Sequence, residues 1–242
     1  NKMKLLYIHI PKTGGTSITE AISQYKDAII TEQHPVYKRN PKYGKNYLNV
    51  LNFKVSKAEH FREVLGENPY QKLWKAAIVR NPWDRYVSNW KWLTRRESVY
   101  PRKGWKARGW SGEDGKVSFE SFIKQMSWCY NDLPTLHGYQ HDKWHIRNQI
   151  EHLTDSNNNI IIDYVGKFEN LQQEFDLICE KADLDLQLPH LNRVGHYSGE
   201  PEEHKKVNIH YSQYYNQELI DIVAERCKAD IEEFGYDYED QR

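Results

Sequence analysis

The chain has 242 residues, in which 34 basic and 34 acidic side chains balance and the pI is near 7.3. This length suits one sizeable domain, so we expect a single domain over residues 1–242. A chain without net charge is a poor general binder of polyanions, so we expect no nucleic-acid partner. No apolar run in the sequence reaches the roughly 18 residues that a membrane span requires.

The spacing of the cysteines indicates the cellular compartment of the protein. Cys129, Cys179 and Cys227 are too widely spaced for a disulfide framework or a zinc site. They are typical of reduced thiols in a cytosolic protein. No signal peptide precedes the first apolar run. We therefore expect a soluble, cytoplasmic protein, with the Golgi lumen as the alternative if an N-terminal anchor has been removed.

The first third of the chain alternates short apolar runs with helical periodicity. In chain order we predict a strand at 4–10, a helix at 16–25, strands at 27–31 and 47–55, and a helix at 57–65. Ile18, Ala21 and Ile22 share one face of the first helix. Ser17 and Glu20 have the spacing of a capping box at its start. Ser56 is the expected cap of the second helix.

A second buried strand–helix unit follows at Leu73–Arg80, "LWKAAIVR". Asn81 is expected to cap a helix whose first position is Pro82, a favourable start. Trp83, Val87 and Trp90 then lie on one core-facing side of that helix. Gly, Ser and many charges over residues 96–117 predict an exposed loop insertion.

The remainder continues the same alternation. We predict a helix at 117–128, a turn and strand leading into a helix over 157–171, and amphipathic helices at 171–184 and 217–236. Strands that alternate with helices indicate an α/β fold with a mainly parallel sheet. Ligands in such folds bind at the carboxyl ends of the strands.

The segment "PKTGGTS" follows the first predicted strand and has the chemistry of an anion site. Free N–H groups and the dipole at a helix N-terminus attract anions. Gly14 and Gly15 let the backbone curl around an oxyanion, and Lys12 supplies a positive charge. The hydroxyl side chains of the segment are Thr13, Thr16 and Ser17. This set predicts a bound phosphate or sulfate.

A P-loop kinase is one alternative. Its motif, Gly-x-x-x-x-Gly-Lys-Ser/Thr, places the lysine after the glycines. Here Lys12 precedes Gly14 and Gly15, and the motif's first glycine is missing. The kinase reading is therefore the weaker one.

A second stretch, "RNPWDRYVS", offers another phosphate contact. Arg80 ends the second strand unit and can grip a phosphate with two hydrogen bonds. Ser88 lies two turns into the following helix and can donate to the same phosphate. Two phosphate contacts on two strand–helix units predict a ligand with two anionic groups.

Together the two stretches resemble sulfotransferases that use 3′-phosphoadenosine 5′-phosphosulfate (PAPS). The segment "HIPKTGGTS" is most similar to the carbohydrate branch, which includes heparan sulfate 2-O-sulfotransferases and bacterial relatives. The segment "DYVGKFENL" is a further similarity to the family. The resemblance implies a P-loop-like, three-layer α/β fold whose central sheet is flanked by helices. It also implies transfer of a sulfuryl group to an acceptor hydroxyl, on a carbohydrate, without a metal, and release of adenosine 3′,5′-bisphosphate (PAP).

Carried over by residue, the resemblance places Lys12 on the 5′-phosphosulfate, where it steadies the leaving phosphate. The residues expected to wrap this group are Thr13, Gly14, Gly15, Thr16 and Ser17. Arg80 and Ser88 are expected to hold the 3′-phosphate.

The catalytic base is open at this point. Lys54 stands where the carbohydrate branch has its catalytic histidine, so that role does not carry over. His34 is our first candidate, since an imidazole titrates near neutrality. Glu32, Lys54 and His60 are the alternatives.

Two further features leave other readings open. His137, His141 and His145 have helical spacing, but a polar face or acceptor contact is a better interpretation than zinc. Residues 90–110 mix tryptophans with basic residues, a pattern that suits an anionic sugar. Because the family's histidine is missing, a non-catalytic module that binds a nucleotide or a sulfated glycan is the second hypothesis.

Overall fold

The structure is a computed structural model that describes residues 4–23, 57–97, 117–126, 147–189 and 209–242. The chain divides into two compact units. The first comprises residues 1–80 and 147–191, and the second comprises residues 81–146 and 192–242. The chain thus passes between the units three times. A single functional domain over residues 1–242 stays a prediction.

The first unit is built on three parallel strands. They are β1 (Lys4–Ile8), β2 (Leu73–Val79) and β3 (Tyr164–Lys167), in the order β1-β2-β3. Tyr7 pairs with Ala76, and Ala76 pairs with Tyr164 on its other side. The central strand β2 is buried along nearly its whole length, as a strand covered on both faces must be. The predicted α/β class with a parallel sheet is confirmed.

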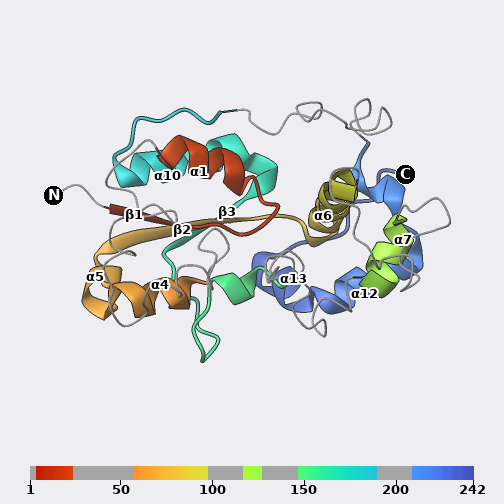
Figure 1. Cartoon of the computed structure of the whole chain (residues 1–242), viewed down its shortest axis with the longest axis horizontal. Coiled ribbons are helices and arrows are strands. Elements are labelled where there is room, and N and C mark those ends of the chain that lie inside the picture. The colour runs from red at the N-terminus through yellow and green to blue at the C-terminus, as the bar shows by residue number, and fades with distance from the viewer. Residues whose placement is uncertain (1–3, 24–56, 98–116, 127–146, 190–208) are drawn as a thin grey trace. The chain divides into compact units, whose positions relative to one another are not determined.

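Helices cover both faces of this sheet (Figure 1). On one face lie α1 (Gly15–Ser23) and α10 (Leu171–Ala182). On the other lie α4 (Ala58–Leu65) and α5 (Glu67–Gln71). Alternate strand residues and one stripe of each covering helix form the core on the α1 side. Its buried members are Leu5, Tyr7, Ile18, Ala21, Ile22, Ala76, Ile78, Phe175, Ile178, Cys179 and Ala182.

The last part of the link from β2 to β3, from residue 147 on, belongs to this unit too. A single 3₁₀ turn, η5 (Ile150–His152), precedes a tight turn in which the Asp155 carboxylate accepts the main-chain N–H groups of Asn157 and Asn159, both at 2.9 Å. After β3 the chain enters another 3₁₀ turn, η6 (Phe168–Asn170), and then α10. The predicted turn, strand and helix start are therefore confirmed.

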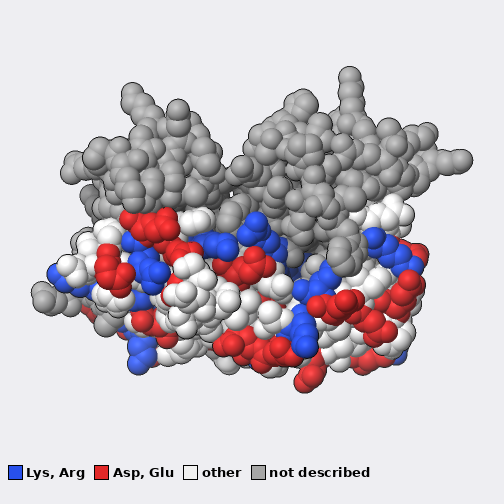
Figure 2. Space-filling view, turned by 90° about the horizontal axis from the view of Figure 1, so that it is seen from below, with Lys and Arg blue, Asp and Glu red and all other residues white. Residues whose placement is uncertain are grey.

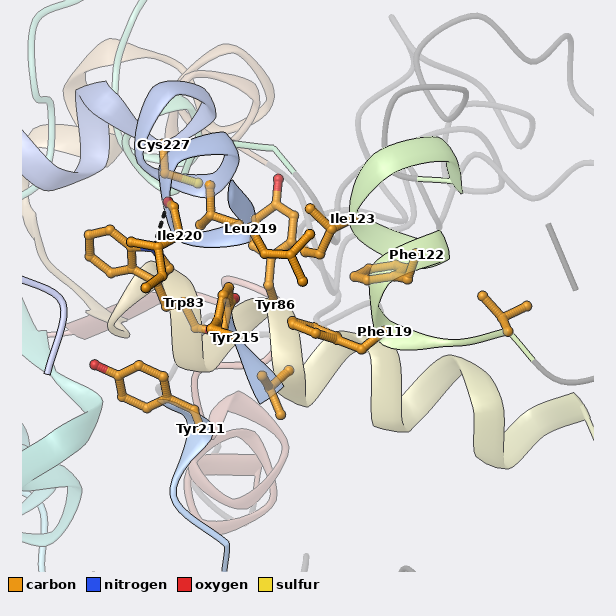
Figure 3. Packing of buried hydrophobic residues seen from close by; sticks show 13 residues of the cluster. Trp83, Tyr86, Phe119, Phe122, Ile123, Tyr211, Tyr215, Leu219, Ile220 and Cys227 are labelled. Atoms are coloured by element: carbon orange, nitrogen blue, oxygen red, sulfur yellow. Dashed lines mark hydrogen bonds between the residues drawn. The ribbon is translucent and has the colours of Figure 1, made fainter. Parts of the chain in front are cut away.

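The second unit is helical where it is described. It contains α6 (Pro82–Glu97), α7 (Phe119–Ser121), the π-helical turn η3 (Phe122–Met126), the 3₁₀ turn η7 (Tyr211–Tyr214), α12 (Gln217–Arg226) and α13 (Lys228–Phe234). Aromatic and aliphatic side chains from α6, α7, η3, η7 and α12 point toward one another in its core (Figure 3). The Trp83 indole donates to the Ile220 carbonyl at 3.1 Å, which ties α6 to α12.

The start of α6 is as predicted. The Asn81 side chain accepts the Trp83 N–H at 3.1 Å, and Pro82 is the first helical residue. Trp83 and Val87 are buried, and Trp90 packs against the same core. The predicted loop insertion is too long at both ends, because α6 continues to Glu97 and Val117 is buried in the core.

Four element predictions need correction or lie outside the described residues. The N-cap of α4 is Lys57, not Ser56. The predicted helix at 217–236 is two helices that meet at Cys227. The strands predicted at 27–31 and 47–55 lie outside the described residues.

On the face shown in Figure 2, the described acidic and basic side chains are interspersed rather than gathered by sign. This agrees with the balanced composition. On this face, the described side chains form no broad field of one sign that would attract a charged ligand.

Candidate functional site

The segment between β1 and α1 forms a tight loop. Strand β1 ends at Ile8 and α1 begins at Gly15, so six residues connect them. Lys12 has φ 71° and Gly14 has φ 77°. A left-handed conformation is unusual for lysine, and such strain is concentrated at functional sites. The loop curls as the motif predicts.

Both glycines are required by close neighbours. A Cβ on Gly14 would lie 2.9 Å from Leu171 Cδ2 and 3.1 Å from Phe168 Cε2. A Cβ on Gly15 would lie 2.5 Å from the His9 ring. The loop thus packs against the start of α10 on one side and against an imidazole on the other. Larger residues at either position would displace it.

The hydroxyl residues of the loop have different surroundings. Thr13 is fully buried, and its hydroxyl donates to the Ile10 carbonyl at 2.9 Å. Complete burial raises the pKa of the nearby Tyr7 hydroxyl. Ser17 is nearly buried, and its N–H donates to the Gly14 carbonyl at 3.0 Å. Thr13 therefore braces the loop from inside.

The first turn of α1 supplies the donors that an anion needs. The first N–H groups of a helix have no intrahelical acceptor and carry partial positive charge. Here they belong to Gly15 and Thr16, directly after the glycine turn. Lys12, which is half-buried, precedes them. The side chain of Thr16 lies outside the described residues.

Arg80 lies at the end of β2 and contacts this loop. Its Nη1 donates to the main-chain carbonyl of Lys12 at 3.1 Å. Its guanidinium carbon lies 4.1 Å from the centre of the Phe168 ring, a cation–π contact. The same ring limits the space beside Gly14. The structure therefore brings together Lys12 and Arg80, which are 68 positions apart in the sequence.

Three strand ends contribute to this place. The loop follows β1, Arg80 follows β2 and Phe168 follows β3. Because the strands are parallel, their carboxyl ends meet at one edge of the sheet, where α/β folds bind ligands. The contacts of Arg80 with Lys12 and Phe168 join the three ends into one site.

Gln149 is a site residue that the sequence did not reveal. Its side chain is fully buried and makes two hydrogen bonds to the main chain of Arg80. Its Oε1 accepts the Arg80 N–H at 2.8 Å, and its Nε2 donates to the Arg80 carbonyl at 2.9 Å. No local pattern around "RNQIEHL" predicts that Gln149 contacts Arg80, which is 69 positions away in the sequence.

His9 was missed as well, although a signal existed. It stands between the end of β1 and the loop, where functional residues of parallel sheets collect. Its ring packs against Gly15. His9 is therefore part of the wall of the loop.

Ser88 belongs to the second unit, where it is half-buried on α6. Its pairing with Arg80 on one phosphate stays a prediction.

Of the four candidates for the catalytic base, only His60 lies among the described residues. His34, Glu32 and Lys54 lie outside the described residues. His60 is on α4, which covers the face of the sheet opposite to α1 (Figure 1). Burial lowers the pKa of His60, with smaller effects from neighbouring charges, of which Glu63 is the largest.

The described residues also bear on two other kinds of feature, a metal site and a membrane span. Within the described ranges, no group of three or more His, Cys, Asp or Glu side chains is arranged to hold a metal ion. His137, His141 and His145 are not among those residues. None of the described helices has both the length and the apolar character that a membrane span requires.

Comparisons with known proteins give one result. Searches of curated proteins and of solved structures found no match. A protein-family model described as the sulfotransferase family matches residues 1–237, nearly the whole chain. The chain therefore belongs to the sulfotransferase family.

Proposed function

We propose that the protein transfers the sulfuryl group of PAPS to a hydroxyl of a carbohydrate acceptor and releases PAP. Membership of the family supports sulfuryl transfer in general. The choice of PAPS rests on the two phosphate motifs and on the contact between them. That contact, from Arg80 Nη1 to the Lys12 carbonyl, is the observation that carries the proposal.

Each motif has a separate task in the proposed reaction. The loop with Lys12, Thr13, Gly14, Gly15, Thr16 and Ser17 binds the 5′-phosphosulfate. Main-chain N–H groups at the start of α1 and the Lys12 ammonium stabilise the negative charge that grows on the 5′-phosphate as it leaves. Arg80, with Ser88, binds the 3′-phosphate, which distinguishes PAPS from other adenine nucleotides.

The chemical step is an in-line displacement at sulfur. A bond forms between the acceptor oxygen and sulfur while the bond from sulfur to the 5′-phosphate oxygen breaks. The hydroxyl proton passes to a base, for which His34 is the first candidate and Glu32, Lys54 and His60 are the others. By analogy with loose phosphoryl transfer, catalysis comes mainly from positioning and charge stabilisation. The proposed mechanism uses no metal.

The carbohydrate acceptor rests on narrower support. The segment "HIPKTGGTS" resembles the corresponding segment of the carbohydrate branch. Residues 90–110 are rich in indoles and basic side chains, which suits a sugar with acidic groups. Trp90 and Trp92, at the start of this segment, pack against the core of the second unit, so this support comes from the residues that follow them. Most of that segment lies outside the described residues.

Isothermal titration calorimetry with PAP and AMP tests the proposed site. PAP is expected to bind at least about tenfold more tightly than AMP, because a charged hydrogen-bonded contact to the 3′-phosphate contributes roughly 1.5–3 kcal/mol. Incubation with PAPS labelled in the sulfuryl group and a panel of glycans, lipids and small alcohols then identifies the acceptor class. Equal affinity for PAP and AMP would refute the proposed site, and label on lipids alone would refute the carbohydrate acceptor.

A further inference from the structure

The main-chain N–H and carbonyl of Arg80 lie beyond the paired residues of the sheet. The ladder between β1 and β2 ends at the pair Ile8–Ala77, and the ladder between β2 and β3 ends at Val79–Lys167. Arg80 therefore lies beyond both ladders, three residues past the first and one residue past the second. Its N–H and carbonyl need partners from elsewhere, because buried main-chain polar groups are almost always hydrogen-bonded.

Gln149 supplies both partners with one side chain. Its primary amide presents a carbonyl oxygen and an N–H side by side, as a neighbouring strand would. The two hydrogen bonds, at 2.8 and 2.9 Å, have good lengths and are shielded, since Gln149 is fully buried. They fix the main-chain conformation of Arg80 and hence the direction in which its side chain leaves the sheet.

The guanidinium of Arg80 has two contacts of its own, separate from those of its main chain. The Phe168 ring lies 4.1 Å from the guanidinium carbon, and the Lys12 carbonyl accepts from Nη1 at 3.1 Å. Arg80 is thus held at its main chain by Gln149 and at its guanidinium by Phe168 and Lys12. A guanidinium held in this way loses little conformational entropy when it binds an anion.

We propose that Gln149 is a positioning residue, which holds Arg80 so that its guanidinium is pre-oriented for the 3′-phosphate of the nucleotide. This inference rests on the proposed function. Methionine would fill nearly the same volume at this position, so packing alone does not require an amide. The amide matters because it bonds both main-chain polar groups of Arg80.

The experiment compares wild type with Gln149→Met by calorimetry against PAP and AMP. The readout is the ratio of the two dissociation constants, Kd for AMP divided by Kd for PAP. We expect the variant to reduce this ratio by about tenfold, the size of one charge-assisted hydrogen bond. The affinity for AMP should change by less than about twofold, because the loop that holds the 5′-phosphate keeps its own contacts.

Two companion variants keep the test decisive. Gln172→Met is the matched control, because Gln172 is an exposed glutamine of the same unit whose side chain donates to Asp176 within α10. It should leave the ratio unchanged. Gln149→Asn keeps an amide but is too short for both bonds, and it replaces Gln149→Met if that variant does not fold. We expect it to reduce the ratio by about threefold.

The possible outcomes separate the two proposals. A wild type that binds PAP and AMP equally refutes the proposed function, and this inference with it. A wild type that discriminates, with a Gln149 variant whose melting temperature falls but whose ratio is unchanged, overturns only this inference. A reduced ratio in the Gln149 variant and an unchanged one in the Gln172 control support it.

Discussion

Gly15→Ala tests how tightly the loop is packed. The added Cβ would lie 2.5 Å from two atoms of the His9 ring, whereas carbon atoms in contact prefer about 3.5–4.0 Å. Either the ring or the helix start must move by about 1 Å. Overpacking of this kind costs about 1–3 kcal/mol. Alanine returns up to about 1 kcal/mol as a better helix former, so we expect a net loss of about 1–2 kcal/mol.

Differential scanning calorimetry measures this loss. For a chain of this size, 1 kcal/mol corresponds to about 2–4 °C, so the melting temperature should fall by about 2–8 °C. His9→Ala removes the clashing ring, so the double variant should lose less than the sum of the single ones. The coupling free energy should be at least about 1 kcal/mol.

Gly235→Ala is the matched control. Gly235 has φ 62°, and among the described residues no atom other than those of its chain neighbours lies within 4 Å of the position of its Cβ. Its substitution costs backbone strain of about 1–2 kcal/mol that His9→Ala cannot relieve. An unchanged melting temperature in Gly15→Ala, or strict additivity with His9→Ala, would refute the steric argument.

Three further predictions concern Arg80, His60 and the buried thiols. Arg80→Lys keeps the charge but loses the planar fork, so PAP should bind about tenfold more weakly or worse while AMP changes less than about twofold in calorimetry; equal losses for both ligands would contradict the assignment. Burial lowers the pKa of His60 below 6.5, so the unfolded state takes up the proton first as the pH falls. The free energy of unfolding should therefore decrease below about pH 6.5, and His60→Gln should reduce that slope in urea titrations; an equal slope in the variant speaks against it. Burial raises the pKa of Cys179 to about 11 and that of Cys227 to about 12, so at pH 9 neither native thiol should react with a disulfide reagent until urea unfolds the chain; rapid reaction of either native thiol would show the burial to be wrong.

Local sequence patterns were enough to predict the strands and the helix that position the candidate site residues. The apolar runs of β1 and β2 and the Asn81–Pro82 signal of α6 lie where the sequence predicts them. Each depends on residues close in sequence, such as the side chain of Asn81 on the N–H of Trp83. Parallel pairing then follows from the alternation of strands and helices. It places the loop and Arg80 at the same edge of the sheet.

Other features depend on distant contacts, and sequence patterns missed them. Ser17 and Glu20 suggest a capping box, but α1 already begins at Gly15, and Ser17 lies inside it with its N–H on the Gly14 carbonyl. The glycine turn thus starts the helix earlier than the cap pattern indicates. The break at Cys227 carries no Gly or Pro signal, and it occurs at a residue buried in the core of the second unit.

The most important omission was Gln149. Its role depends on the point where two strand ladders end, which tertiary structure alone decides. A glutamine has no preferred function in sequence, whereas lysine, arginine and glycine in a short loop do. This is why sequence patterns pointed to Lys12 and Arg80 and not to Gln149.

A crystal structure with bound PAP tests the central claim most directly. We predict one nucleotide whose 5′-phosphate lies on the loop with Lys12 and the first N–H groups of α1, and whose 3′-phosphate accepts from the Arg80 guanidinium. A nucleotide bound elsewhere, or one whose 3′-phosphate points away from Arg80, would contradict the claim.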